Sequence, residues 1–337
     1  MPNEKRVRKS LEEILIPGAM RSPVQLNLVR EIIISDQKVN INLASAALNP
    51  GIQDWLKSQI SGNISQLPGV SQINVNFVES TPKEINEVSH VIAVMSGKGG
   101  VGKSLVAALL SIALARQRKE AGILDADITG PSIPKIFGLG NVRPSSSETG
   151  ILPVLSKLGI SIMSINLLLE HEDDAVVWRG PIISKVIQQF WEDVLWGKLD
   201  YLIVDLPPGT ADAPLTVMQT LPVSGVVIVF SPQELAAMVV KKAVRMADQM
   251  KIPILGVVEN MSYLTLPGSG EKLELFGKSR GQEMARAAGA PLLAQIPVDP
   301  ELARLCDQGK IERYSSEILD NLNQNFIKAL SLKAKQD

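Results

Sequence analysis

The spacing of apolar and polar positions changes near residue 85, which divides the chain into a short first part and a long second part. In the first part, one stretch carries apolar side chains at helical spacing, and the others are short apolar or alternating runs of the kind that form strands. The predicted elements are strands at 24–34, 38–46 and 70–78 and a helix at 51–64. A polar link at residues 79–86 contains a proline, so we expect a small α/β domain over residues 1–85.

In the second part, residues 86–337, continuous apolar runs alternate with longer amphipathic stretches. Continuous apolar runs are typical of parallel strands buried on both faces, and the stretches between them are typical of helical crossovers. The predicted strands are 90–95, 201–204, 225–230, 254–258 and 292–296, and the predicted helices are 104–117, 181–195, 234–250, 280–288 and 317–334. This order predicts a doubly wound, mostly parallel sheet with helices on both faces.

The composition is that of an ordinary globular protein, with 45% hydrophobic and 20% charged residues in a chain of 337. Because the net charge is −1, we expect no nucleic-acid partner. The basic cluster at residues 5–9 is interpreted as a solvated helix face. The apolar stripe at residues 318–330 follows acidic residues and is interpreted as a docked core helix, so no stable membrane association is expected. The single cysteine, Cys306, excludes an intrachain disulfide and favours a cytoplasmic protein.

The strongest chemical signal follows the first strand of the second part. Residues 96–104 read S-G-K-G-G-V-G-K-S, which contains the pattern G-x-x-x-x-G-K-S between a predicted strand and a predicted helix. Glycines let main-chain N–H groups turn toward phosphate oxygens, and the start of the helix adds its positive dipole end. We expect Lys103 to bridge the β- and γ-phosphates of ATP and the Ser104 hydroxyl to bind Mg²⁺. The predicted nucleotide-binding residues of this loop are Gly97, Lys98, Gly99, Gly100, Val101, Gly102, Lys103 and Ser104.

A second lysine early in the loop, Lys98, makes the signal more specific. The string resembles the deviant Walker A group, in which the early lysine reaches across a dimer interface to the nucleotide of the partner subunit. An extra cation there compensates the charge that develops on the phosphates during transfer. The resemblance therefore predicts a catalytic Lys98 and a homodimer.

Two acidic positions end predicted strands, where parallel strands bring their carboxyl ends to one edge of a sheet. Asp127 lies in L-D-A-D at residues 124–127 and is a candidate for positioning the attacking water or a Mg²⁺-bound water, with Asp125 as the second choice. Asp205 ends the run Y-L-I-V-D and is followed by L-P-P-G. It is the expected Walker B aspartate, which holds Mg²⁺ through water. Ser104, Asp127 and Asp205 are thus the predicted metal-site residues, with Lys98, Lys103 and Asp127 as the catalytic group.

Several longer strings resemble the Mrp/ApbC family of P-loop ATPases, iron–sulfur cluster carriers related to MinD and to the nitrogenase iron protein. They are S-G-K-G-G-V-G-K-S (96–104), L-D-A-D-I-T-G-P-S (124–132), W-R-G-P (178–181), D-Y-L-I-V-D-L-P-P-G-T (200–210), V-E-N-M-S-Y (258–263) and I-P-V-D-P (296–300). The resemblance implies a MinD-like fold and ATP hydrolysis. It also implies a homodimer and delivery of an iron–sulfur cluster to apoprotein clients or exchange with assembly factors. It implies further that Asn260 and residues 297–299 line the adenine, and that the first part is a SufT-like domain.

The chain departs from that family at its cluster ligands. Members that carry a cluster have C-P-x-C shortly after the N-M-S-Y string, whereas this chain has Leu266 and Ser269 at the two cysteine positions. A [4Fe–4S] cluster is normally held by four thiolates, and a dimer of this chain supplies only two, both Cys306. Cys306 itself is interpreted as a buried structural thiol. Two hypotheses therefore stay open: a carrier of iron–sulfur clusters, and an ATP-switched positioning or scaffold protein of the MinD/ParA kind.

Overall fold

The computed structural model describes residues 3–128, 130–169, 180–210, 212–233 and 236–333. The chain forms two compact units, and each is described by itself. The first comprises Met1–Ser89 together with Arg143–Leu155 and Gln189–Leu199, and the second comprises His90–Val142, Ser156–Gln188 and Asp200–Asp337. The first unit thus includes two segments that follow residue 85 in the sequence.

The first unit is built on a three-stranded sheet that is covered by helices. Its elements are α1 (Glu4–Glu12), β1 (Val29–Ser35), β2 (Lys38–Ala44), α2 (Pro50–Ser65), β3 (Gln72–Val78) and α3 (Pro82–Ile85), with the short strands β6 (Ser145–Ser147), β7 (Gly150–Leu152) and β8 (Val154–Leu155). β2 lies between β1, to which it is antiparallel, and β3, to which it is parallel. Asn49 begins α2 by accepting a hydrogen bond from the Ile52 N–H, and Ile41 and Ile60 are fully buried in the core of the unit.

The predicted hairpin is confirmed, but the prediction that its first strand begins at residue 24 is wrong. Residues 23–27 form turns, and β1 begins at Val29. Ser22 and Gln25 exchange hydrogen bonds between side chain and main chain, and Asn27 has a positive φ of 57°. A positive φ cannot be part of a regular strand. These local polar contacts decide the conformation against the apolar pattern.

The second unit is a doubly wound parallel sheet, as predicted. Its strands follow the order β15-β12-β11-β4-β10-β5-β9, and the pairs β10–β5, β11–β4, β11–β12, β12–β15 and β5–β9 are parallel. The strands of this sheet are β4 (Glu87–Met95), β5 (Ala121–Asp125), β9 (Ser161–Ser164), β10 (Lys198–Asp205), β11 (Gly225–Phe230), β12 (Ile254–Asn260) and β15 (Leu292–Ile296). Two further strands, β13 (Leu264–Thr265) and β14 (Lys272–Leu273), pair with each other outside it. The helices are α4 (Lys103–Arg116), α5 (Ile133–Phe137), α6 (Gly180–Glu192), α7 (Asp212–Thr220), α8 (Ala236–Gln249), α9 (Gly281–Ala288), α10 (Pro300–Asp307) and α11 (Glu317–Lys333), with 3-10 turns at Ile165–Leu167 and Ile311–Arg313.

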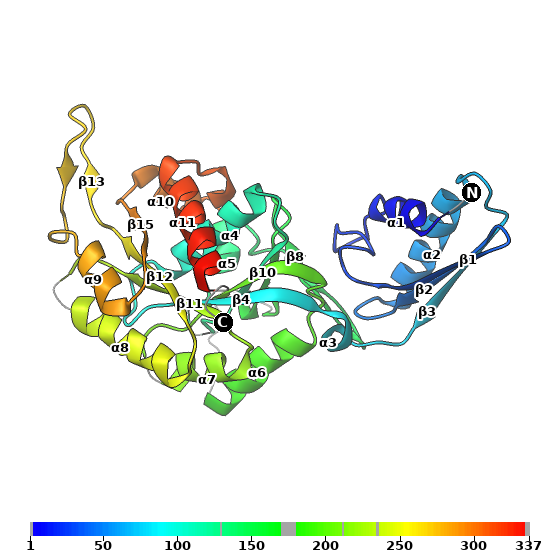
Figure 1. Cartoon of the computed structure of the whole chain (residues 1–337), viewed down its shortest axis with the longest axis horizontal. Helices are drawn as coiled ribbons and strands as arrows, with labels where there is room; N and C mark the ends of the chain where they lie inside the picture. Colours follow the sequence, from blue (N-terminus) through cyan, green and yellow to red (C-terminus); the bar gives the residue numbers. More distant parts are fainter. Residues whose placement is uncertain (1–2, 129, 170–179, 211, 234–235, 334–337) are drawn as a thin grey trace. The chain divides into compact units, whose positions relative to one another are not determined.

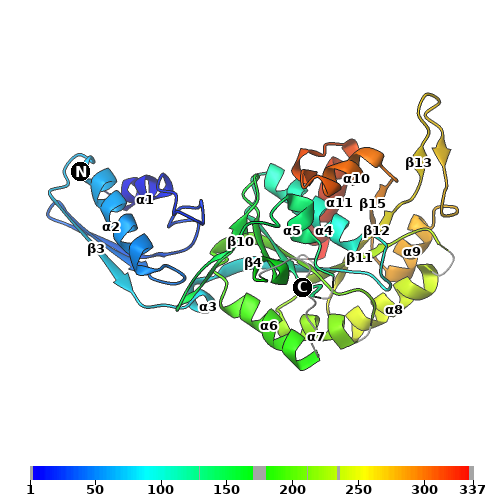
Figure 2. The same ribbon diagram turned by 180° about the vertical axis from the view of Figure 1, so that it is seen from behind.

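Helices cover both faces of this sheet. In Figure 1 and in the reverse view of Figure 2, α4, α5, α10 and α11 lie on one face and α6, α7 and α8 on the other. Every residue of β11 and of β12 is buried, and so are the last five residues of β4 and of β10. Each interior strand therefore contributes side chains to two apolar layers, which explains the continuous apolar runs in the sequence.

The C-terminal stripe is confirmed as the docked face of a core helix. Leu319, Leu322, Phe326 and Ala329 of α11 are buried, and the helix packs on β15 and α4. In the first unit, Lys5, Arg6 and Lys9 are exposed on α1 while Val7 and Leu11 are buried, so the basic cluster is a solvated helix face as predicted. No helix in the described part of the chain is both long and apolar enough to cross a bilayer.

Candidate functional site

The predicted phosphate-binding loop connects β4 to α4 at the carboxyl edge of the sheet. Gly100 and Gly102 have φ values of 76° and 82°, and Gly102 is the residue immediately before α4. These left-handed values favour glycine at both positions. The loop lines a cavity of about 320 Å³ whose other walls include Asp127, Ser132, Ile136 and Pro208. The structure thus places the loop, the start of α4 and an acidic residue around one cavity.

Lys103 is the central cation of this cavity. Its side chain is 6% exposed, and its Nζ atom lies 2.5 Å from Oδ1 of Asp205 and 3.8 Å from Oδ2 of Asp127. Asp205 is the last residue of β10, and Asp127 follows β5, the strand paired with β10. The fold therefore brings together Lys103, Asp127 and Asp205, which the sequence predicted as neighbours.

One oxygen of Asp205 has no hydrogen-bond partner among the described residues. Asp205 is fully buried, and its Oδ2 atom accepts no hydrogen bond within the described part of the chain. Burial raises the pKa of this carboxyl, while the Lys103 ammonium and the nearby Ser104 hydroxyl oppose that rise. A buried carboxylate oxygen beside a serine hydroxyl and a phosphate-binding loop fits the ligand chemistry of Mg²⁺, which prefers hard oxygen donors and keeps several waters.

Asp125, the second choice in the sequence, lies at the end of β5 and braces the segment that follows. Its carboxylate accepts hydrogen bonds from the N–H groups of Asp127 and Ile133, both at 3.3 Å, and from the Ser164 hydroxyl at 3.2 Å. Burial and the neighbouring Asp205 raise the pKa of Asp125 well above its usual range, against the opposing effect of Lys103. Asp125 therefore orients Asp127 and the start of α5, a role that the D-x-D spacing alone did not reveal.

The two ends of the loop contact neighbouring elements. Lys98 donates a hydrogen bond from Nζ to the side-chain oxygen of Gln233, so in a single chain this lysine points toward the segment before α8. The Gly209 N–H donates to the Ser96 carbonyl at 3.0 Å, which attaches the Pro-Pro-Gly segment to the loop. The predicted trans role of Lys98 concerns a second subunit and stays a prediction.

Asn260, the last residue of β12, packs directly on the loop. Its side-chain amide donates to the Val101 carbonyl at 2.9 Å, and a Cβ atom added at Gly102 would lie 2.1 Å from the same amide nitrogen. Among residues 297–299, the Val298 N–H donates to the Tyr263 carbonyl, and Asp299 caps α10 by accepting from the Glu301 and Leu302 N–H groups. The predicted contacts of Asn260 and of residues 297–299 with adenine stay predictions.

The sequence of this site matches a known family over most of the chain. Residues 87–330 match the model described as ParA: NUBPL iron-transfer P-loop NTPase. The chain belongs to this family of P-loop NTPases. An iron–sulfur cluster carrier protein of Aquifex aeolicus is 38% identical to it over an alignment of 307 residues, and the match covers 82% of this chain and 84% of the relative.

Two solved structures relate this NUBPL-type NTPase to nucleotide-bound proteins. A nucleotide-binding protein of Archaeoglobus fulgidus in complex with ADP is 48% identical, with a TM-score of 0.63 over 69% of this chain and 91% of its own. The septum site-determining protein MinD of Pyrococcus horikoshii, in complex with Mg-ADP, has a TM-score of 0.52 at 21% identity and covers 74% of this chain and 100% of its own. The second likeness concerns the fold alone.

The segment that would carry cluster ligands in this family is a hairpin arm, defined here as residues 262–279. It contains β13 and β14, which pair in antiparallel register, and it projects beyond the sheet in Figure 1. Leu266 and Ser269 lie at its turn, and no group of three or more His, Cys, Asp or Glu side chains within the described residues is arranged to hold a metal ion. Trp178 and Arg179, which begin the family string W-R-G-P, lie outside the described residues.

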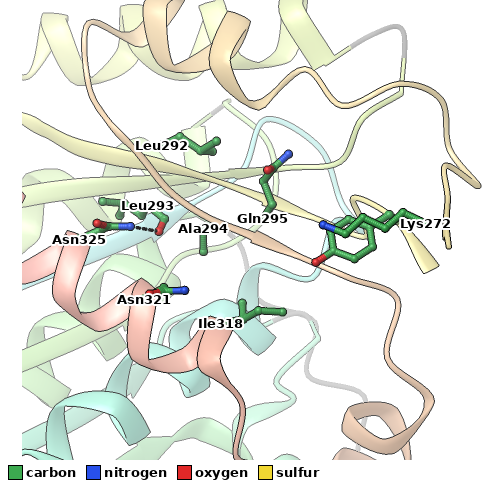
Figure 3. A pocket seen from close by; sticks show the side chains of 9 residues that line it. Lys272, Leu292, Leu293, Ala294, Gln295, Ile318, Asn321 and Asn325 are labelled. Carbon is green, nitrogen blue, oxygen red and sulfur yellow. Dashed lines mark hydrogen bonds between the residues drawn. The ribbon is translucent and has the colours of Figure 1, made fainter. Parts of the chain in front are cut away.

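A second cavity, of about 310 Å³, lies beside the base of the arm. Figure 3 shows its floor on β15 and one wall on α11, where Asn325 donates to the Leu293 carbonyl at 2.9 Å. The Nζ atom of Lys272, a residue of the arm, lies 4.1 Å from the centre of the Tyr263 ring and makes a cation–π contact at the rim of this cavity. Gln295 points from β15 to the side opposite Ala294, because side chains alternate along a strand.

Proposed function

We propose that this chain binds and hydrolyses ATP with Mg²⁺ and uses the nucleotide to switch a homodimer that serves iron–sulfur cluster delivery. The observation that supports it most directly is the placement of Lys103 between Asp127 and Asp205 at the mouth of a glycine-rich loop. A single buried cation facing two acids is arranged to exchange one carboxylate partner for phosphate oxygens. The family relationship adds support, because relatives in it are named iron–sulfur cluster carrier proteins.

In this proposal each residue of the cavity has one task. Main-chain N–H groups of residues 97–102 bind the phosphates, and Lys103 leaves Asp205 to contact the β- and γ-phosphates. Ser104 and Asp205 would hold Mg²⁺, which would neutralise charge on the phosphate oxygens. Asp127 orients the attacking water, and Asp125 keeps Asp127 in place through the Asp127 N–H.

Lys98 makes the proposal specific to a dimer. In the free chain it is held by Gln233, and in the dimer it would reach the nucleotide of the partner subunit. Sedimentation velocity with a slowly hydrolysed ATP analogue tests this step. We expect the analogue to shift the wild-type protein toward dimer, and Lys98→Ala to reduce both the shift and phosphate release. An unchanged monomer–dimer equilibrium in both proteins would refute the trans role.

In this proposal the cluster is a cargo that the chain does not bind through four cysteine thiolates. The hairpin arm has no cysteine, and burial together with Asp307 raises the pKa of the Cys306 thiol to about 11. A thiol binds metal as the thiolate, so Cys306 is a poor ligand at neutral pH. We therefore expect the nucleotide switch to act on the partner that holds the cluster.

Anaerobic purification followed by iron and acid-labile sulfide analysis tests the cargo. We expect less than one [4Fe–4S] equivalent in the isolated dimer, and ATP-dependent transfer to an apoprotein when a cluster donor is added. Absence of any effect of ATP on transfer would leave the second candidate, an ATP-switched scaffold, which the missing thiolates favour. Phosphate release by the wild-type protein and its loss in Lys103→Ala separate either switch from a protein that only binds nucleotide.

A further inference from the structure

A buried carboxylate outside the nucleotide cavity lies at the base of the hairpin arm. Glu259, the next-to-last residue of β12, is 0% exposed. Its Oε2 atom accepts hydrogen bonds from the hydroxyls of Ser262 and Ser279, both at 2.6 Å, and from the Gln295 side-chain amide at 2.9 Å. Its Oε1 atom accepts from the Arg280 main-chain N–H at 2.7 Å. Four uncharged donors thus compensate the burial of this side chain.

These donors come from both ends of the arm and from the neighbouring strand. Ser262 begins the arm, and Ser279 ends it immediately before Arg280 and α9. Gln295 belongs to β15 and is the partner of Glu259 in the parallel register of β12 and β15. Gln295 also donates to Ser279 at 2.6 Å. One carboxylate therefore ties the outgoing and returning chain of the arm to the edge of the sheet.

The residue after Glu259 contacts the phosphate-binding loop. Asn260 donates to the Val101 carbonyl at 2.9 Å, and its amide nitrogen lies so close to Gly102 that a Cβ atom there would be 2.1 Å away. Successive side chains of a strand point to opposite faces. The end of β12 therefore holds the loop with one side chain and the arm with the next.

We propose that Glu259 is a positioning residue that couples the hairpin arm to the nucleotide state of the loop. A shift of the Val101 carbonyl on nucleotide binding moves Asn260 and the end of β12, and the hydrogen bonds of Glu259 carry that shift to both ends of the arm. The inference rests on the proposed nucleotide binding and adds a route from the nucleotide to the surface where family members place their cluster ligands.

Hydrogen–deuterium exchange of residues 262–279, with and without Mg-ATP analogue, measures this coupling directly. In the wild-type protein we expect nucleotide to change the exchange rates of the arm by at least about threefold, which is about 0.65 kcal/mol of opening free energy at 25 °C. Glu259→Gln should abolish most of this difference. The new side-chain amide would place an N–H donor against the Gln295 amide, which also donates, so this hydrogen bond would be lost. Ser279→Ala, which removes one donor only, should reduce it less.

The exchanged pair Glu259→Gln with Gln295→Glu separates coupling from simple packing. The double variant again places one carboxylate and one amide face to face, so we expect it to restore the nucleotide-dependent difference that Glu259→Gln loses. A defect that does not come from the lost carboxylate–amide pair would not be rescued in this way. Should Glu259→Gln fail to fold, the graded loss in Ser279→Ala and the rescue in the double variant carry the test.

Calorimetry of the same samples keeps the two proposals apart. If the wild-type protein does not bind Mg-ATP analogue, the proposed function is wrong. If it binds but the exchange of the arm does not change, or if Glu259→Gln retains the full difference, the coupling by Glu259 is wrong. We expect the affinity of all variants to stay within about threefold of the wild-type value, a difference of about 0.65 kcal/mol.

Discussion

The Lys103 ammonium lies 2.5 Å from Oδ1 of Asp205, and neither side chain is more than 6% exposed. A buried ion pair of this kind contributes little net stability, yet removal of one partner is costly because the other charge stays buried. Asp125 adds a second carboxyl to the same layer, and the pKa values of Asp125 and Asp205 are both raised. The Lys103 ammonium therefore compensates the charge of more than one carboxyl group, and the electrostatic balance of the cavity depends on it.

Lys103→Ala should lower the rate of phosphate release by at least about 100-fold, since a preorganised donor to the transferring phosphate is lost. It should also lower the free energy of unfolding by about 3–5 kcal/mol near neutral pH. That loss should be smaller at pH 5 than at pH 8, because the acids left without their cation take up protons more readily at low pH. Urea unfolding at the two pH values and a phosphate-release assay measure both effects.

The matched control is Lys119→Ala, which removes an exposed lysine after α4. Its free energy of unfolding should change by less than about 0.5 kcal/mol and show no added pH dependence. Equal losses of stability in the two variants would contradict the central role of Lys103.

Gly102→Ala should destabilise the nucleotide-free protein more than Gly100→Ala. Both positions have left-handed φ values, which cost an L-residue about 1–2 kcal/mol. Only at Gly102 would the new methyl group meet a neighbour, the Asn260 amide at 2.1 Å, whereas nothing lies within 4 Å of it at Gly100. Chemical denaturation of both variants gives the comparison.

A double-mutant cycle attributes the difference to Asn260. In an Asn260→Ala background the cost of Gly102→Ala should fall by about 0.5–3 kcal/mol, the usual range for residues in contact. The cost of Gly100→Ala should be the same in both backgrounds. An additive cycle at Gly102 would show that the close approach to Asn260 does not determine the requirement for glycine.

Sequence reasoning located the cavity because its residues follow strands in a parallel sheet. Asp205 ends a buried strand, Asp127 follows one closely, and Lys103 begins the helix after the loop that leaves a third, so the parallel topology brings the three together. The four donors around Glu259 come from residues 262, 279, 280 and 295, with no periodic or motif pattern among them. Such a network depends on how the hairpin arm returns to the sheet, so tertiary structure was needed to find it.

Local polar chemistry explains the other difference. The strand predicted at residues 24–34 begins only at Val29, because Ser22 and Gln25 exchange local hydrogen bonds and Asn27 has a positive φ, features that an apolar count does not register. The role of Asp125 was likewise not predicted, because it also depends on local polar contacts. Its carboxylate faces N–H groups of the following segment, a capping role that is invisible in a D-x-D string.

Asp125→Asn should change the dependence of stability on pH. A carboxyl whose pKa is raised in the folded protein above the unfolded value near 3.8 binds more protons when folded. Its contribution to the free energy of unfolding therefore falls as the pH rises from about 3.8 toward the raised pKa. Relative to Asp125→Asn, the wild-type protein should lose stability over this window. Urea unfolding at several pH values between 4 and 8 measures the difference, and a constant offset would contradict the raised pKa.

Cys306 should react slowly with iodoacetamide, because the reactive species is the thiolate and the pKa of this thiol is about 11. The alkylation rate of the folded protein should still rise about tenfold per pH unit between pH 8 and pH 9, with no plateau, because the thiolate fraction rises tenfold per unit below its pKa. In urea the pKa should return to near 8.5 and the rate at pH 8 should increase strongly. Mass spectrometry of the intact chain follows the reaction without interference, since the chain has one cysteine. A plateau near pH 8 in the folded protein would instead mark an activated thiol and would make Cys306 a competent metal ligand.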